Sequence, residues 1–295
     1  MPANNPMTTP PPARISVVTP CFNSVKTIRD TIESVLTQNY PNFEHIVMDG
    51  GSTDGTLELL KEYPHLKWIS AKDEGHYDAM NRGIEWAGGE IIPILNSDDC
   101  FRPGTFEKVA RAFAEHPDWD GLFGDVVYVD GEGREIYRAF EAVFDFNVLR
   151  FTGVNYVIHQ SLFVKKRIYD RLGGYRHKDF KNSCDYEFVL RLGRAGCTVG
   201  HLPEYILNYR YHNFGQSADL RIARNMLREA ALIQQEYGCP QGWKGRVLRL
   251  LYRAKRQVQK LRARGKIDLA TGDWKLRKHR REKAVFSSNI GLDKL

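Results

Sequence analysis

The stretch IIPILNSDDC, residues 91–100, reads as a buried strand that ends on two adjacent aspartates. Its first five positions are apolar without alternation, which is typical of a strand covered on both faces. Asp98 and Asp99 follow almost at once, although neighbouring carboxylates repel each other. In open parallel sheets, ligands bind beyond the carboxyl ends of the strands, so this arrangement indicates a site at the edge of a sheet.

The sequence on either side of this stretch alternates between short apolar strands and amphipathic helices. This alternation predicts an α/β fold, in which a mixed, mainly parallel central sheet is flanked by helices. Gly131 and Gly133 predict a hairpin over 126–140, which adds antiparallel strands at the sheet edge. The other strands are expected at 15–20, 45–48, 67–70, 159–164 and 198–209, and the other helices near 28–36, 56–63, 77–87, 103–115, 185–195 and 217–237.

Charge is divided unevenly along the chain. Residues 241–295 hold 17 Lys and Arg against 4 Asp and Glu, whereas residues 1–240 are mildly acidic. We therefore expect three parts: a Pro- and Asn-rich disordered lead-in at 1–13, a folded body at 14–240 and a basic helical extension at 241–295. In the extension an apolar stripe runs among the basic residues, a form suited to a membrane surface or a partner groove. Its members are Val247, Leu251, Val258 and Leu261.

Several protein classes are excluded by composition. No apolar run approaches the ~20 residues of a membrane-spanning helix, and the N-terminus lacks the apolar core of a secretory signal, so we expect a cytoplasmic protein. The five cysteines have neither CxxC nor Cys/His ligand spacing, which argues against a disulfide framework and a structural zinc site.

Acidic side chains follow three of the predicted strands. Asp49 comes after the strand at 45–48, and Asp73 and Glu74 come shortly after the strand at 67–70. Together with Asp98 and Asp99 they would concentrate negative charge at one edge, which a divalent cation with oxygen ligands, Mg²⁺ or Mn²⁺, would neutralise. A helix cap before Pro103 explains the Asp-Asp pair equally well on the sequence alone.

Longer segments resemble a known family. ISVVTPCFNSVKTIRDTIESVLTQNYPNFEHIVMDGGSTDGT, from residue 15, and DEGHYDAMNRGIEWAGGEIIPILNSDD, from residue 73, resemble family 2 glycosyltransferases of the GT-A fold. The second segment is similar to bacterial members that build surface polysaccharides on lipid-linked acceptors. The resemblance implies a GT-A catalytic domain at 14–240. It also implies inverting, metal-dependent transfer from a nucleotide sugar, with UDP favoured, to a saccharide or lipid-linked saccharide acceptor.

The resemblance also implies residue roles on the donor side. Asp49 would accept the N–H of a uracil ring, and Asp99 would bind the Mn²⁺ or Mg²⁺ ion through a DxD-type motif whose first acid is replaced by Ser97. Asp98 would contact the ribose or the sugar. Met80 departs from the arginine that many members carry. The implied donor-binding residues are Thr19, Pro20, Phe22, Asp49, Asp78, Asn81 and Asp98.

On the acceptor side, NSCDYEFVLRL, residues 182–192, resembles a motif with Glu-Asp before a helix, and Cys184 replaces the glutamate. Asp185 is then the catalytic base that takes the proton of the attacking hydroxyl. Periodicity alone favours a plain helix N-cap for Asp185, a role compatible with the first. Glu187 is the competing candidate. The weaker assignments are acceptor contacts by His159, Gln160 and Glu187, and a metal or phosphate contact by His212.

The basic extension leaves two hypotheses for partners. We expect it to contact an anionic membrane surface, which would place the site near a lipid-linked acceptor at the inner face of the cell membrane. The alternative is a nucleic-acid-binding protein that uses residues 241–295. The extension has few aromatic residues for stacking on bases, so we favour the membrane and expect no nucleic-acid partner.

Overall fold

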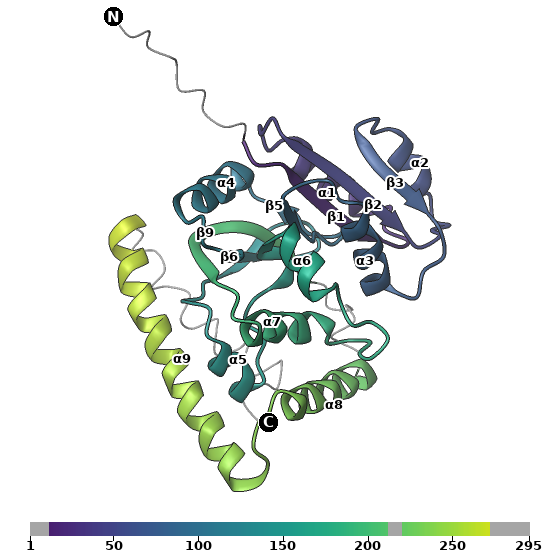
Figure 1. Ribbon diagram of the computed structural model, residues 1–295. Coiled ribbons are helices and arrows are strands. Elements are labelled where there is room, and N and C mark those ends of the chain that lie inside the picture. The colour runs from purple at the N-terminus through teal and green to yellow at the C-terminus, as the bar shows by residue number, and fades with distance from the viewer. Residues whose placement is uncertain (1–11, 212–219, 272–295) are drawn as a thin grey trace, which may run out of the picture.

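The computed structural model describes residues 12–211 and 220–271. Within these ranges the chain folds around a central sheet flanked by helices (Figure 1). The sheet is mixed and has nine strands in the order β3-β2-β1-β4-β8-β6-β9-β5, with β7 paired to β6. The α/β fold with a mixed sheet and flanking helices is therefore confirmed.

The N-terminal half of the sheet is parallel. Its strands are β1 (Ile15–Cys21), β2 (Phe43–Asp49), β3 (Leu66–Ser70) and β4 (Ile91–Pro93). All seven residues of β1 are buried, as expected for a β-branched strand covered on both faces. In register, Cys21 pairs with Asp49 and Asp49 with Ser70, so these strands end at one edge. The connecting helices are α1 (Ile28–Leu36), α2 (Thr56–Lys61) and α3 (His76–Trp86).

The second half mixes strand directions. The elements are β5 (Cys100–Phe101), α4 (Thr105–Glu115), β6 (Gly121–Val129), β7 (Glu135–Ala139), β8 (Leu162–Lys165) and β9 (Val199–Arg210). Strand β8 lies antiparallel between β4 and β6, while β9 runs parallel to β6 and antiparallel to β5. The β6–β7 pair confirms the predicted hairpin. Strand β9 therefore reaches back to the segment that follows β4.

The sequence did not predict two short helices, and it placed the start of one strand wrongly. Helices α5 (Phe146–Thr152) and α6 (Lys166–Leu172) have seven residues each, too few for a clear helical period. The strand expected at 159–164 begins only at Leu162, because residues His159–Ser161 form a 3₁₀ turn, η1. His159 and Gln160 therefore lie on a turn and not on a strand.

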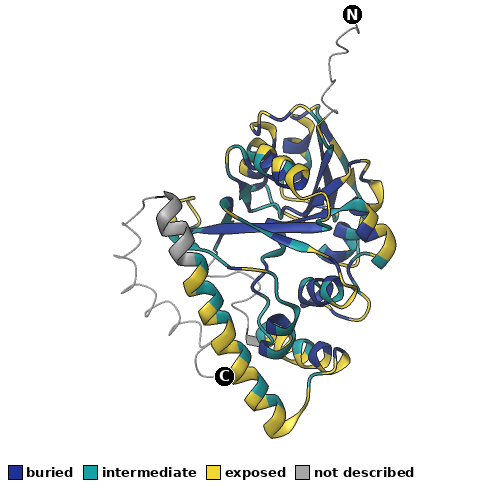
Figure 2. Cartoon of the chain, turned by 60° about the vertical axis from the view of Figure 1, so that its left-hand side comes forward, coloured by how far each residue is buried: buried dark blue, intermediate teal, exposed yellow. Residues whose placement is uncertain are grey.

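The C-terminal helices are α7 (Cys184–Arg194), α8 (Leu220–Glu236) and α9 (Gly242–Thr271). Helix α9 runs along one side of the molecule, far from β3 and α2 (Figure 1). It is anchored there by ion pairs, because Glu141 contacts Arg256 at 2.8 Å and Lys260 at 2.9 Å, and Asp145 contacts Lys255 at 2.6 Å. The outer face of α9 is exposed along most of its length (Figure 2). None of the described helices is long and apolar enough to cross a membrane.

Candidate active site

The segment after β4 turns sharply at the edge of the sheet. The backbone N–H of Leu95 still bonds to Val18 of β1, and the N–H of Asp99 then closes a turn onto the carbonyl of Asn96. The Thr31 hydroxyl donates to the carbonyl of Asp99 at 2.9 Å, which fixes the turn from α1. Asp98 is left partly exposed, whereas Asp99 is only 1% exposed. The two adjacent carboxylates therefore occupy different environments.

The carboxylate of Asp99 is buried and only half satisfied. Its Oδ1 accepts the backbone N–H of Arg210, the last residue of β9, at 2.8 Å. Its Oδ2 is buried and has no partner among the described residues. Burial, followed by the nearby charge of Asp98, holds the pKa of Asp99 well above its ordinary value. A buried carboxylate oxygen without a donor suits a hard divalent cation, because the cation supplies the missing positive charge.

The rest of a metal shell is not assembled from described side chains. Within 12–211 and 220–271, no group of three or more His, Cys, Asp or Glu residues is placed to hold an ion. His212, named as the second ligand, lies outside the described residues. Sites for Mg²⁺ commonly use one or two carboxylates and complete their shell with water and substrate phosphates, so Asp99 beside Asp98 fits that kind of site.

Asp49, at the end of β2, differs from Asp99 because both of its carboxylate oxygens accept hydrogen bonds. Its Oδ2 accepts the backbone N–H groups of Gly51 and Ser52 at 2.9 Å and the hydroxyl of Ser70 at 2.6 Å, and its Oδ1 accepts the hydroxyl of Ser52. Burial alone would raise the pKa of Asp49, but these hydrogen bonds outweigh it and lower that pKa. The only capacity left for a uracil N–H is on Oδ1.

The other predicted donor residues differ in accessibility. Thr19 is fully buried, and its hydroxyl bonds to Nε2 of His45 at 2.9 Å. Burial lowers the pKa of His45 to about 3, so this ring is neutral. Pro20 is also buried, whereas the Phe22 ring is 61% exposed just beyond β1. Of the three, Phe22 is the one that presents a ring to a base.

Asn81 and Asp78 connect α3 to the loop before α7. The Asn81 amide accepts the backbone N–H of Tyr175 at 2.7 Å and donates to the Tyr175 carbonyl at 2.8 Å. Asp78 accepts the N–H of Glu74 at 3.2 Å and lies 3.7 Å from the ring of His177. The Asn81 amide is therefore committed to holding this loop in place. Met80 is fully buried in the core, so it contributes no polar group to the site.

Asp185 lies in the first turn of α7. Its Oδ1 accepts the hydroxyl of Tyr77 at 3.0 Å and its Oδ2 accepts the amide of Asn155 at 3.0 Å. The side chain is 25% exposed, which leaves it reachable by a ligand. The cap position of α7 belongs to Ser183, so the interpretation of Asp185 as an N-cap is wrong. Its carboxylate faces other side chains and not the helix backbone.

The turn η1 joins the two acidic regions. Nδ1 of His159 lies 4.0 Å from Oδ2 of Asp185. The negative charge of Asp98 is also close enough to affect the pKa of the same ring. Burial lowers the pKa of His159 against the opposing effect of these two carboxylates. Gln160, the next residue, is buried, and its side chain lowers the pKa of Asp99 against the effect of burial. Asp98, Asp99 and Asp185 therefore all lie near one short turn, although Asp185 is far from the other two in the sequence.

Glu187 has a different set of neighbours. It is fully buried, and its carboxylate bonds to Arg191 at 2.9 Å and to the hydroxyl of Tyr237 at 2.9 Å, with Arg176 at 3.4 Å. These partners tie α7 to the end of α8. The structure brings His159 and Gln160 to Asp185 and Asp99, but it does not bring Glu187 into that group.

Two polar residues at this site were missed on the sequence, namely Tyr77 and Asn155. Tyr77 lies within DEGHYDAMNRG, a segment already singled out by its resemblance to the family, and the sequence places it on the helix that became α3. Asn155 follows α5 in a segment without a recognisable pattern.

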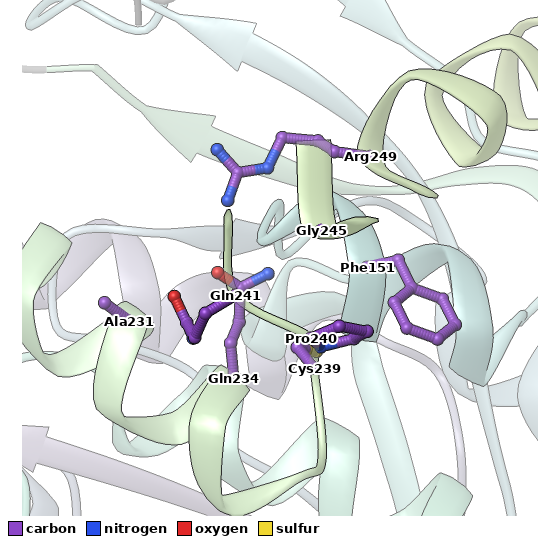
Figure 3. A pocket seen from close by; sticks show the side chains of 8 residues that line it. All are labelled: Phe151, Ala231, Gln234, Cys239, Pro240, Gln241, Gly245 and Arg249. Atoms are coloured by element: carbon purple, nitrogen blue, oxygen red, sulfur yellow. The ribbon is translucent and has the colours of Figure 1, made fainter. Parts of the chain in front are cut away.

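A separate hollow lies between α5, α8 and α9 (Figure 3). Its volume is about 70 Å³, room for roughly two water molecules and far too little for a nucleotide sugar. It is lined by Phe151, Ala231, Gln234, Cys239, Pro240, Gln241, Gly245 and Arg249. None of the predicted donor, metal or acceptor residues is among them.

The chain is similar to several known proteins. Residues 16–173 match the model of the family described as glycosyl transferase family 2. A "PGL/p-HBAD biosynthesis glycosyltransferase" of Mycobacterium bovis is 30% identical over 219 residues, which cover 72% of this chain and 82% of that protein. An uncharacterized glycosyltransferase of Mycobacterium tuberculosis is 34% identical over 185 residues, which cover 60% of this chain and 68% of that protein.

Solved structures show the same fold. Residues 1–349 of S. aureus TarS in complex with UDP-GlcNAc match with a TM-score of 0.57 and 20% identity, over 75% of this chain and 66% of that one. A longer TarS chain gives the same TM-score at 19% identity, and the match spans only 39% of its length. From the family model and the Mycobacterium relatives, the chain belongs to glycosyl transferase family 2.

Proposed function

We propose that this family 2 glycosyltransferase moves one sugar from a UDP-sugar to a hydroxyl of a saccharide or lipid-linked saccharide, with inversion and with Mg²⁺ or Mn²⁺ bound. The observation that carries the proposal is the convergence of Asp98, Asp99 and Asp185 on the turn η1. The donor class is supported by the TarS neighbours solved with UDP and with UDP-GlcNAc.

The chemistry is a single displacement. An electron pair of the acceptor oxygen forms a bond to the anomeric carbon, while the bond from that carbon to the diphosphate oxygen breaks and its electrons leave with UDP. The acceptor proton passes to Asp185, whose side chain is 25% exposed and keeps acceptor positions free beside the hydrogen bonds from Tyr77 and Asn155. Attack from the face opposite the leaving group inverts the anomeric centre.

Asp99 and Asp98 are the residues that would hold the cation and the donor. A bound divalent cation disperses the charge that develops on the leaving diphosphate. Arg210 keeps this edge in shape, because its guanidinium donates to the Asp98 carbonyl at 3.0 Å and to Asp30 at 2.8 Å. Phe22 offers the exposed ring against which a base can stack.

The test is UDP release and sugar transfer by the full chain, screened over UDP-sugars with Mg²⁺ or Mn²⁺. Asp185→Asn is expected to lower kcat by about 10²–10⁴-fold while UDP binding, followed by calorimetry, is retained. Asp170→Asn is the matched control, because Asp170 is an exposed carboxylate on α6 that pairs with Lys166. Unchanged turnover in Asp185→Asn would remove Asp185 from the mechanism.

We further propose that the outer face of α9 rests on an anionic membrane surface. This face carries an apolar stripe whose side chains are 45–67% exposed. The stripe consists of Trp243, Val247, Leu250, Leu251, Val258 and Leu261. Arg246, Arg253 and Arg262 are exposed as well, whereas Lys255, Arg256 and Lys260 pair with the body. An apolar stripe flanked by basic residues is the form of an interfacial helix.

Co-sedimentation with vesicles of phosphatidylserine and phosphatidylcholine tests this surface. The double variant Leu250→Gln, Leu251→Gln is expected to lose vesicle binding and keep UDP release. Leu36→Gln, which changes an exposed leucine on α1, serves as the control. Equal binding by all three proteins contradicts the proposal. Salt-sensitive RNA binding without vesicle binding would support the nucleic-acid alternative.

A further inference from the structure

We propose that Tyr77 and Asn155 are positioning residues that fix the Asp185 carboxylate for proton transfer from the acceptor hydroxyl. This inference rests on the proposed function, in which Asp185 is the base. Each residue donates one hydrogen bond to a different oxygen of Asp185, at 3.0 Å in both cases. A carboxylate offers about four acceptor positions, so both oxygens keep capacity for the acceptor hydroxyl.

Tyr77 is held firmly by its surroundings. It is 5% exposed, its ring centre lies 5.4 Å from that of Tyr175, and Tyr175 in turn contacts Phe188 of α7 at 5.1 Å. Asn81 fixes the backbone of Tyr175 from α3. The helix that carries Asp185 and the helix that carries Tyr77 are thus locked together through packed rings. The hydroxyl of Tyr77 has little freedom to leave the carboxylate.

Asn155 closes the other side of the carboxylate. Its Nδ2 donates to Asp185, while its Oδ1 is buried and has no partner among the described residues. The Nε2 atom of His159 is likewise buried and has no hydrogen-bond partner among the described residues. Two unpaired buried polar atoms beside the base indicate a place where hydroxyl groups of a saccharide are bound, since buried polar groups are normally paired.

The charged and titratable groups around Asp185 come from five parts of the fold, namely α3, the loop before α7, α7 itself, β9 and η1. Burial raises the pKa values of Tyr77 and Tyr175 well above the ordinary value of a tyrosine. Burial also lowers the pKa of His76 to about 4. The hydroxyl of Tyr77 is therefore a donor throughout the neutral range. The neighbouring groups are Tyr77, His76, Tyr175, Cys184, Tyr209 and His159.

The two donors hold the Asp185 carboxylate in one orientation, and proton transfer needs an accepting oxygen within hydrogen-bond reach of the acceptor hydroxyl. Removing one of the two donors leaves that orientation less fixed. The effect reaches catalysis through Asp185, so it is not expected where Asp185 is absent.

The experiment measures kcat and KM for transfer in the full-length protein and in Tyr77→Phe and Asn155→Leu. Each variant is expected to lower kcat by roughly tenfold and to leave the KM for the donor within about twofold. UDP affinity is expected to stay within twofold. Tyr169→Phe is the matched control, because this tyrosine belongs to the same ring cluster and its hydroxyl lies next to Tyr175 and not Asp185.

A double-mutant cycle separates positioning from general loss of structure. In the Asp185→Asn background, Tyr77→Phe is expected to change the residual rate less than twofold. An equal loss with and without Asp185, or a rise in the KM for the donor with kcat unchanged, overturns the inference. Asn155→Leu gives the same decision if Tyr77→Phe is poorly folded. Failure of the wild-type chain to transfer any sugar contradicts the proposed function itself, which is a distinguishable result.

Discussion

Asp49 and Asp99 are two buried carboxylates at the end of the same sheet, and their environments are opposite. Asp49 accepts four hydrogen bonds from its own loop and from Ser70, and its pKa is lowered. Asp99 keeps one buried oxygen without a partner in the described chain, and its pKa is raised first by burial and then by Asp98. The fold stabilises the charge of Asp49 through hydrogen bonds, whereas the role proposed for Asp99 is to bind a cation. Position after a strand therefore does not fix the role of a carboxylate.

Between these two carboxylates, the larger effect on activity is expected from Asp99→Asn. Metal-dependent UDP release should fall by about 10²–10³-fold, because a neutral amide no longer offsets the charge of the cation. Thermal stabilisation by Mn²⁺ should also be lost. Removal of metal from the wild type with EDTA should reproduce the loss of activity, and addition of Mn²⁺ should restore it. A variant that still gains stability from Mn²⁺ would show that Asp99 and Asp49 do not differ in this way.

Asp49→Asn should act mainly on folding. The amide of asparagine carries no charge, and its NH2 group cannot accept a hydrogen bond at the second oxygen position, so the bonds from Gly51, Ser52 and Ser70 are weakened or lost. The free energy of unfolding should therefore fall by about 2–3 kcal/mol. Urea denaturation followed by circular dichroism measures the change. Stabilisation of the surviving folded protein by Mn²⁺ should persist. A drop below about 0.5 kcal/mol would mean that the loop does not depend on the charge.

The stabilisation by Asp49 should depend on pH in a defined direction. Its folded pKa lies below its unfolded value, so the contribution is present above the unfolded pKa and is lost as the pH falls through the folded one. The difference in unfolding free energy between wild type and Asp49→Asn should therefore be full at pH 7 and shrink below about pH 4. Urea titrations at several pH values measure it. A constant difference from pH 7 to pH 3 would contradict the assignment.

The smallest effect is expected from Asp54→Ala. Asp54 is exposed in the same loop as Asp49, and it bonds to the N–H groups of Thr56, the first residue of α2, and of Val25. Loss of these bonds should cost about 1 kcal/mol, in the range of a helix-capping residue. Transfer activity should be unchanged. A large loss of activity would instead place Asp54 at the donor site.

Much of the fold was predictable because it depends on local pattern. The β-branched runs, the glycine turn of the hairpin and the spacing of α1, α3 and α4 all report burial within a few residues. The short helices α5 and α6 escaped, and so did the 3₁₀ turn at His159, because tertiary contacts and not periodicity define them. The roles of Thr19, Pro20, Phe22, Asp49, Asp78, Asn81 and Asp98 stay predictions.

The extension at 241–295 was only partly predictable. Its basic, amphipathic character is written in the composition, and helix α9 confirms a helix over Gly242–Thr271. The sequence did not predict which basic side chains of α9 face outward. That depends on ion pairs with the body, in which Glu141 binds Arg256 and Lys260, and Asp145 binds Lys255. Residues 1–11, 212–219 and 272–295, which include His212 and most of the lead-in, lie outside the described structure.

By itself, the sequence determined the alternation of strands and helices, the placing of carboxylates after strands and the family resemblance, since these depend on residues close together in the chain. The tertiary structure decided which carboxylates are satisfied. Asp99 meets Arg210 across 111 residues and Asp185 meets Tyr77 across 108. Such pairings follow from how β9 and α7 return to the edge of the sheet, and no local period encodes that return.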